Sequence, residues 1–281
     1  MYQYIPTIEA AREAETALLA AARHAPDLPL VHVLWGQLKL YLRWDWHEAG
    51  PHIERASATD PRDALALAYT AFLNGMLGNL EISRDAASNA VAADPLSLFV
   101  RAVSVMGFPT VGIPGCDSDA ALVRHDEALE LDPNSMINLW MSSVRLADFD
   151  RHGEALERIR RAVELTQRGP LMVGLYSRAL ALAGRRDEAL LLREELRARA
   201  AREYVGPASF LMMVVLGLDD EEATAALLRE NIQAMTGPTA IVTPVARELP
   251  PLFSHVRLGP LVRKLTLWST APVVPTMPAL Q

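Results

Sequence analysis

Residues 139–165 read LWMSSVRLADFDRHGEALERIRRAVEL. Apolar residues recur in this segment every three or four positions, break off at residues 148–153 and then resume. That spacing places the apolar side chains on one face of each of two helices, with a turn between them. The segment therefore predicts a helix–turn–helix hairpin.

Five more copies of this pattern occur at almost constant spacing. The small residue that opens the second helix of each copy recurs at intervals of 34, 38, 34, 34 and 34 residues. These residues are Ala49, Ser83, Ala121, Ala155, Ala189 and Ala223. A small side chain here lets two helices approach closely, because packed helix axes lie only ~8–10 Å apart. A fixed period of this length indicates a repeat architecture.

Asp-Pro dipeptides close three of the copies, at residues 60–61, 94–95 and 132–133. Proline cannot continue a helix and restrains the residue before it, but it suits the first turn of the next helix. Each Asp-Pro is therefore expected both to end one hairpin and to begin the next.

These features resemble the tetratricopeptide repeat, a helix–turn–helix unit of about 34 residues. The resemblance covers about residues 8–235 and rests on Trp35-Gly36, the glycines in the turns, the small residues and the closing Asp-Pro pairs. It implies an all-α, right-handed solenoid of about six hairpins over residues 1–235. A proline-rich capping segment and an apolar tail would follow over residues 236–281. Segments such as 184–189 and 202–207 are similar to the repeat regions attached to bacterial winged-helix transcriptional regulators, adenylyl cyclases and protein kinases.

Composition excludes several classes of function. Of 281 residues, 51% are hydrophobic and 22% are charged, as in a globular protein. A net charge of −7 provides no broad positive surface for DNA or RNA. No apolar run approaches the ~20 residues that span a bilayer, and the start lacks a secretory signal pattern. With Cys116 as the single cysteine, a reducing compartment fits, so we expect a cytoplasmic protein that binds neither nucleic acid nor membrane.

No motif in the sequence names a reaction. It contains no phosphate-binding glycine loop, no nucleophile elbow and no dinucleotide fingerprint. The seven histidines form no i,i+4 pair with a helical glutamate, and there is no cysteine pair. We therefore predict no metal site and no cofactor, and an enzyme is not the expected function.

The resemblance implies that the first helix of each hairpin lines a concave groove. Our binding candidates in this largely apolar row are Tyr41, Phe72, Met76, Phe99, Met106, Trp140, Asp148 and Arg178. Asp148 and Arg178 either pair with each other or orient a ligand. Trp140 is the expected hot spot, because Trp and Arg dominate binding energy at interfaces. The alternative is that many of these side chains pack between neighbouring repeats.

The interval of 38 residues adds four residues to the third copy, within 107–119. Three glycines and two prolines there prevent a continuous helix. The segment is either a tolerated surface insertion or a binding loop. Its candidates are Phe108 and Cys116, with His125 nearby as a possible partner of the thiol. Acidic neighbours oppose activation of Cys116, so an inert thiol is favoured.

An apolar groove favours an apolar partner. That partner would be a peptide or protein, including a second copy of the chain or its own C-terminal tail. The sequence thus predicts a protein-interaction or regulatory module. The alternative is a small-molecule binder or an atypical enzyme that uses the groove and the 107–119 loop as a pocket.

Overall fold

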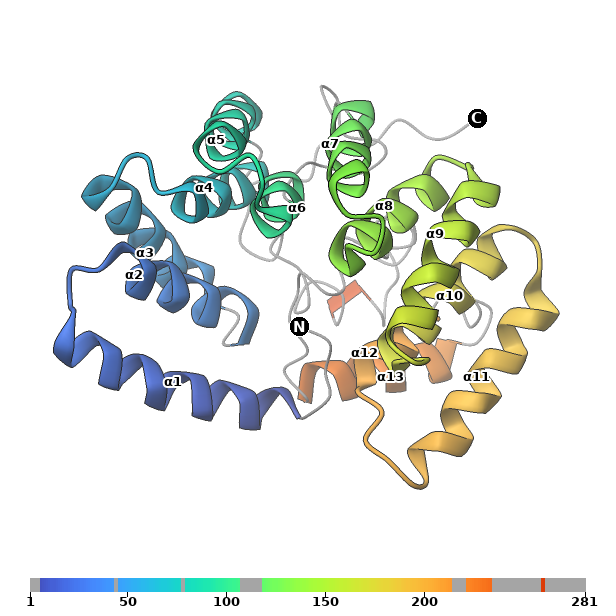
Figure 1. Cartoon of the computed structure of the whole chain (residues 1–281). Coiled ribbons are helices and arrows are strands. Elements are labelled where there is room, and N and C mark those ends of the chain that lie inside the picture. The colour runs from blue at the N-terminus through green and yellow to red at the C-terminus, as the bar shows by residue number, and fades with distance from the viewer. Residues whose placement is uncertain are drawn as a thin grey trace.

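The computed structural model describes residues 6–42, 45–76, 79–106, 118–213, 221–233 and 259–260. In chain order the elements are α1 (Thr7–His24), α2 (Pro29–Gln37), the π-helix η1 (Leu38–Leu42), α3 (Trp46–Thr59), α4 (Ala64–Met76), α5 (Leu80–Ala93), α6 (Leu98–Met106), α7 (Ser118–Leu131), α8 (Met136–Asp148), α9 (His152–Leu165), α10 (Pro170–Leu182), α11 (Arg186–Ala200), α12 (Pro207–Leu211) and α13 (Glu221–Gln233). Over these residues the predicted all-α class is confirmed (Figure 1). Of the predicted C-terminal segment only residues 259–260 are described, and they are helical.

Neighbouring helices pack in a repeating order. The helices pair as α2 with α3, α4 with α5, α6 with α7, α8 with α9, α10 with α11 and α12 with α13. The first helices also pack on one another, α2 on α4, α4 on α6, α6 on α8, α8 on α10 and α10 on α12. Figure 1 shows these pairs following one another around an arc, from the blue α2 and α3 to the orange α12 and α13. Each helix pair is thus placed beside the next one in sequence.

The small residues near the start of the second helices are buried in five of the six pairs. Ala49, Ser83, Ala121, Ala155 and Ala189 have no exposed surface. Ala223 is exposed, so the prediction for the last pair is wrong. In α13 the buried alanine is Ala225, two residues after the position that the repeat predicts. Ala225 belongs to the core cluster that also contains Ala208 and Leu211 of α12.

A buried hydrogen bond recurs with the sequence period. The bonds run from Ser143 Oγ to the carbonyl oxygen of Ala155 at 2.9 Å, from Ser177 Oγ to that of Ala189 at 3.0 Å, and from Ser83 Oγ to that of Ala71 at 2.7 Å. All three join equivalent positions of a helix pair, with donor and acceptor exchanged between the two helices in the third. The period is therefore visible in tertiary contacts as well as in the sequence.

The Asp-Pro turns are closed by the aspartate side chain. Asp60 accepts a hydrogen bond from the backbone N–H of Arg62 at 2.9 Å, Asp94 from that of Ser97 at 3.1 Å, and Asp132 from that of Asn134 at 2.9 Å. The next helix begins three residues after each proline, so the expectation that proline starts it is wrong. Asp63 and Ser97 cap α4 and α6 instead, accepting from the N–H groups of Ala66 at 2.7 Å and Val100 at 3.2 Å.

The two ends of the described array approach each other. α1 packs on α2 and η1, and in Figure 1 its start lies beside the α12–α13 end of the arc. Burial raises the pKa of Tyr204, and the carboxylates of Glu230 in α13 and Glu9 in α1 add to this rise. Glu9 therefore lies within electrostatic range of the last helix pair.

Candidate binding site

The predicted row of first-helix residues is buried where the structure describes it. Phe72, Met106 and Trp140 are at most 5% exposed. Because the first helices pack on one another, these side chains fill the space between neighbouring repeats, as the alternative interpretation proposed. Phe99 differs, since 38% of its surface is exposed. The side chains of Tyr41 and Met76 lie outside the described residues.

The two charged candidates of this row form an ion pair. Arg178 Nη2 donates to Asp148 Oδ1 at 2.6 Å, and each side chain is 1% exposed. Arg178 belongs to α10 and Asp148 to α8, so the pair joins successive first helices inside the array. Removal of one member alone would leave the opposite charge in the interior, so the two side chains depend on each other where α8 packs on α10.

His125 is held by an amide in the interior. It lies in α7 and is fully buried, with Nδ1 2.9 Å from Asn138 Oδ1. Asn138 Nδ2 donates in turn to Ser135 Oγ at 2.8 Å and to the carbonyl oxygen of Leu98 at 3.3 Å. Because Oδ1 only accepts, Nδ1 of His125 carries the proton. Burial, with the positive charge of Arg145, lowers the pKa of His125 to about 3.

A neutral, fully enclosed histidine that bridges α7 and α8 serves the packing of these helices. Its predicted partner in the loop, Cys116, lies outside the described residues, as does Phe108. The loop candidates therefore stay predictions.

Exposed apolar side chains gather at the connections that precede the first helices. These residues are Leu28 before α2 and Leu30 in its first turn, Leu96 before α6 and Phe99 in its first turn, Leu131 at the end of α7, Leu165 at the end of α9 and Tyr204 before α12. Each lies within two residues of such a connection. Because consecutive helices of a hairpin run antiparallel, connections of this kind lie along one edge of an array. We call this set of residues the apolar edge.

The connection that carries Leu96 is fixed by side-chain hydrogen bonds. Arg101 Nε donates to the carbonyl oxygen of Pro95 at 2.9 Å, and Arg101 Nη1 donates to Glu127 Oε2 at 2.9 Å. Leu96 itself is 74% exposed. The structure thus presents an apolar side chain to solvent on a turn that is held in one conformation.

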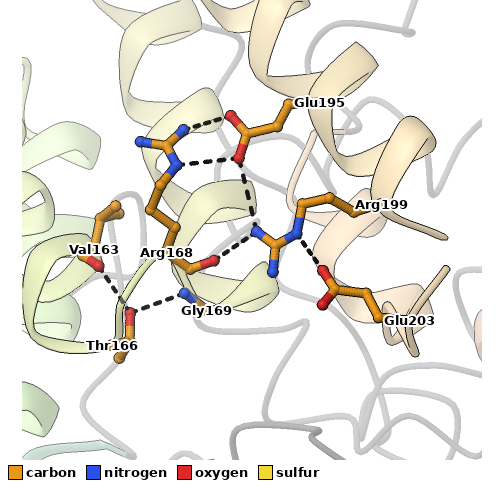
Figure 2. Close-up of polar contacts among 7 residues, drawn as sticks. All are labelled: Val163, Thr166, Arg168, Gly169, Glu195, Arg199 and Glu203. Atoms are coloured by element: carbon orange, nitrogen blue, oxygen red, sulfur yellow. Dashed lines mark hydrogen bonds and ion pairs between the residues drawn. The ribbon is translucent and has the colours of Figure 1, made fainter.

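A second connection of the same edge is held by an ion-pair cluster (Figure 2). Arg168 binds both carboxylate oxygens of Glu195, with its Nε at 3.1 Å. Arg199 donates to the carbonyl oxygen of Arg168 at 2.7 Å and also pairs with Glu195 and Glu203. Gln167 and Arg168 have φ values of 49° and 62°, a conformation that costs such residues about 1–3 kcal/mol. The cluster ties this turn to α11 at the point where the chain passes from α9 into α10.

A histidine pair between α2 and α3 was not predicted from the sequence. His32 Nδ1 lies 3.3 Å from His52 Nδ1. Their separation of 20 residues matches no motif. Their contact depends on how α2 packs against α3, which the spacing of residues in the sequence does not show.

Among the residues that the structure describes, no group of three or more His, Cys, Asp or Glu side chains is arranged to hold a metal ion. None of the described helices combines the length and the apolar character needed to cross a membrane. A comparison with known proteins finds no protein-family model that matches the sequence and no curated protein similar to it.

Proposed function

We propose that this chain is a right-handed α-solenoid of about six tetratricopeptide-like hairpins that works as a protein-interaction module. The repeating order of helix contacts and the recurring bond from a serine to a carbonyl oxygen support the architecture. Arrays of this kind present extended surfaces on which several repeats contribute to one binding site.

The partner binds along the apolar edge, centred on Leu96 and Phe99. The observation that carries this proposal is the exposure of Leu96, 74%, next to Phe99, while the other described apolar candidates are buried. Covering an exposed leucine stabilises a complex by about 1.5–3 kcal/mol. Since the turn is already fixed by Arg101, little conformational entropy is lost when the partner binds.

Replacement of Leu96 by serine tests this site. Leu191 on α11 provides a matched control, because it is 70% exposed and lies outside the apolar edge. We expect tagged wild-type protein and Leu191→Ser to capture the same protein from an extract of the source cells, and Leu96→Ser and Phe99→Ser to lose it. Equal capture by all four forms would show that the edge is not the binding site.

A second candidate function, a small-molecule binder, is favoured by two polar atoms inside the array. The indole N–H of Trp140 and the hydroxyl of Ser209 are buried and have no hydrogen-bond partner among the described residues. An indole N–H only donates, so a bound molecule would have to offer an acceptor inside a largely apolar interior.

Native mass spectrometry of the purified protein tests this second candidate. A bound small molecule would add mass to the wild-type protein and be lost from Trp140→Phe, which keeps the ring and removes the donor. A wild-type mass equal to that of the polypeptide alone would rule out a tightly held ligand.

A further inference from the structure

His32 in α2 and His52 in α3 face each other directly. Their Nδ1 atoms are 3.3 Å apart and their ring centroids 5.6 Å apart, so each ring points its Nδ1 at the other. The ring of Trp35 stacks on His52, with centroids 5.9 Å apart and an interplanar angle of 16°. His32 is buried and His52 is half-buried. The contact therefore joins the two helices of the first pair across a largely enclosed interface.

Such a contact requires one proton between the two facing nitrogens. Nε2 of His32 is buried and has no hydrogen-bond partner among the described residues, so a proton there would be left unsatisfied. The favoured arrangement places the proton of His32 on Nδ1, from which it is donated to the bare Nδ1 of His52. His52 then carries its own proton on Nε2.

A further proton disrupts this arrangement whichever ring accepts it. On Nδ1 of His52 it would place two N–H groups face to face, unless the proton of His32 moved to Nε2, which is buried and has no partner among the described residues. On Nε2 of His32 it would create a buried cation without a partner for its new N–H. Both outcomes oppose the packing of α2 against α3.

The surrounding charges favour the neutral pair. The groups that act on His52 are Lys39 of η1 and Glu48 and Arg55 of α3, and two of these three are cations. α4, which packs on both α2 and α3, has no charged residue, and no charged group of α1 acts on His52. Burial, followed by the charges of His32 and Lys39, lowers the pKa of His52.

We propose that the His32–His52 contact is an acid-operated latch, which holds α2 against α3 while both rings are neutral and loosens this pair when a proton is taken up. A histidine whose pKa is lowered on folding stabilises the folded state above the unfolded pKa of about 6.5, and this contribution is lost as the pH falls. The device acts at the N-terminal end of the row of first helices and does not depend on the proposed partner.

Hydrogen exchange at pH 7.5 and pH 5.5, corrected for the intrinsic effect of pH on exchange, tests the latch. α10 and α11 contain no histidine and serve as the internal reference. In the wild type and in His24→Asn, an exposed histidine, we expect the amides of α2 and α3 to lose protection several-fold more than those of α10 and α11. In His52→Asn, whose side-chain oxygen can still accept from His32, this excess loss should largely disappear. Equal losses in all helices of the wild type would overturn the proposal.

A second measurement does not depend on any variant. At pH 7.5 the ¹⁵N shifts of the ring nitrogens should show His32 protonated at Nδ1 and His52 protonated at Nε2. Finding both rings protonated at Nε2 would exclude the hydrogen bond and with it the latch.

Discussion

Arg178 of α10 and Asp148 of α8 form an ion pair of 2.6 Å with both side chains removed from solvent. The two residues are 30 positions apart in the sequence. The repeat is 34 residues long, so Arg178 lies about one helical turn before the position in α10 that is equivalent to Asp148 in α8. Equivalent faces of successive first helices are therefore in contact at this point. Substitutions in this pair therefore test how closely one repeat packs on the next.

Removal of one member should destabilise the protein far more than removal of both. Arg178→Met leaves the carboxylate of Asp148 buried, so we expect a loss of about 3–5 kcal/mol in the free energy of unfolding. The double variant Arg178→Met/Asp148→Leu should recover most of this loss. Urea unfolding provides the measurement, with Arg185→Met on an exposed ion pair as the control that leaves the midpoint unchanged. A midpoint for Arg178→Met equal to that of the control would contradict the burial of the pair.

His125 should make the protein sensitive to acid. The pKa of His125 is about 3 in the folded protein, below the value of about 6.5 in the unfolded chain. The neutral histidine therefore contributes to the free energy of unfolding above pH 6.5, and this contribution is lost as the pH falls toward 3. Between pH 7.5 and pH 5.5 the free energy of unfolding should fall by about 1.4 kcal/mol on this account alone. In His125→Asn, which keeps a donor toward Asn138, that part of the fall should be absent. The same pH dependence in wild type and variant would show that His125 does not titrate on unfolding.

Two glycines should respond in opposite ways to alanine. A Cβ at Gly174 would lie 2.2 Å from the carbonyl oxygen of Ser209, which is backbone and cannot rotate away. Gly174→Ala should therefore cost about 2 kcal/mol or more and move α12 away from α10. At Gly153 in α9 nothing lies within 4 Å of the added methyl group, so Gly153→Ala should stabilise the helix by about 0.5–1 kcal/mol. Thermal unfolding of the two variants would distinguish these effects, and a neutral Gly174→Ala would argue against the close approach of the two helices.

The period of the sequence predicted the helix pairs because it follows from backbone packing, in which a small residue is needed wherever two helices approach. Ala155 and Ala189 satisfy this rule. Ala223 does not satisfy it, since it is exposed and Ala225 is the alanine of α13 that packs into the core. The turns were predicted only in part, since the helix start depends on a capping side chain such as Asp63 rather than on the proline.

The candidate site was harder to predict than the fold. A repeat motif places Phe72 and Trp140 on the row of first helices, but it does not show how deeply the neighbouring helices bury them. Leu96 was not singled out, because an exposed apolar residue in a turn has no periodic signal. His32 and His52 were missed for a related reason, since their contact depends on the register of one hairpin.

The affinity of the captured partner for three forms of the chain tests the central proposal most directly. Calorimetry or surface-based binding would compare wild type, Leu96→Ser and Leu191→Ser, each shown by circular dichroism to be folded. We predict that Leu96→Ser raises Kd about tenfold or more, since loss of a buried leucine contact costs at least about 1.4 kcal/mol, while Leu191→Ser leaves Kd unchanged. Identical Kd values for Leu96→Ser and wild type would contradict binding at the apolar edge.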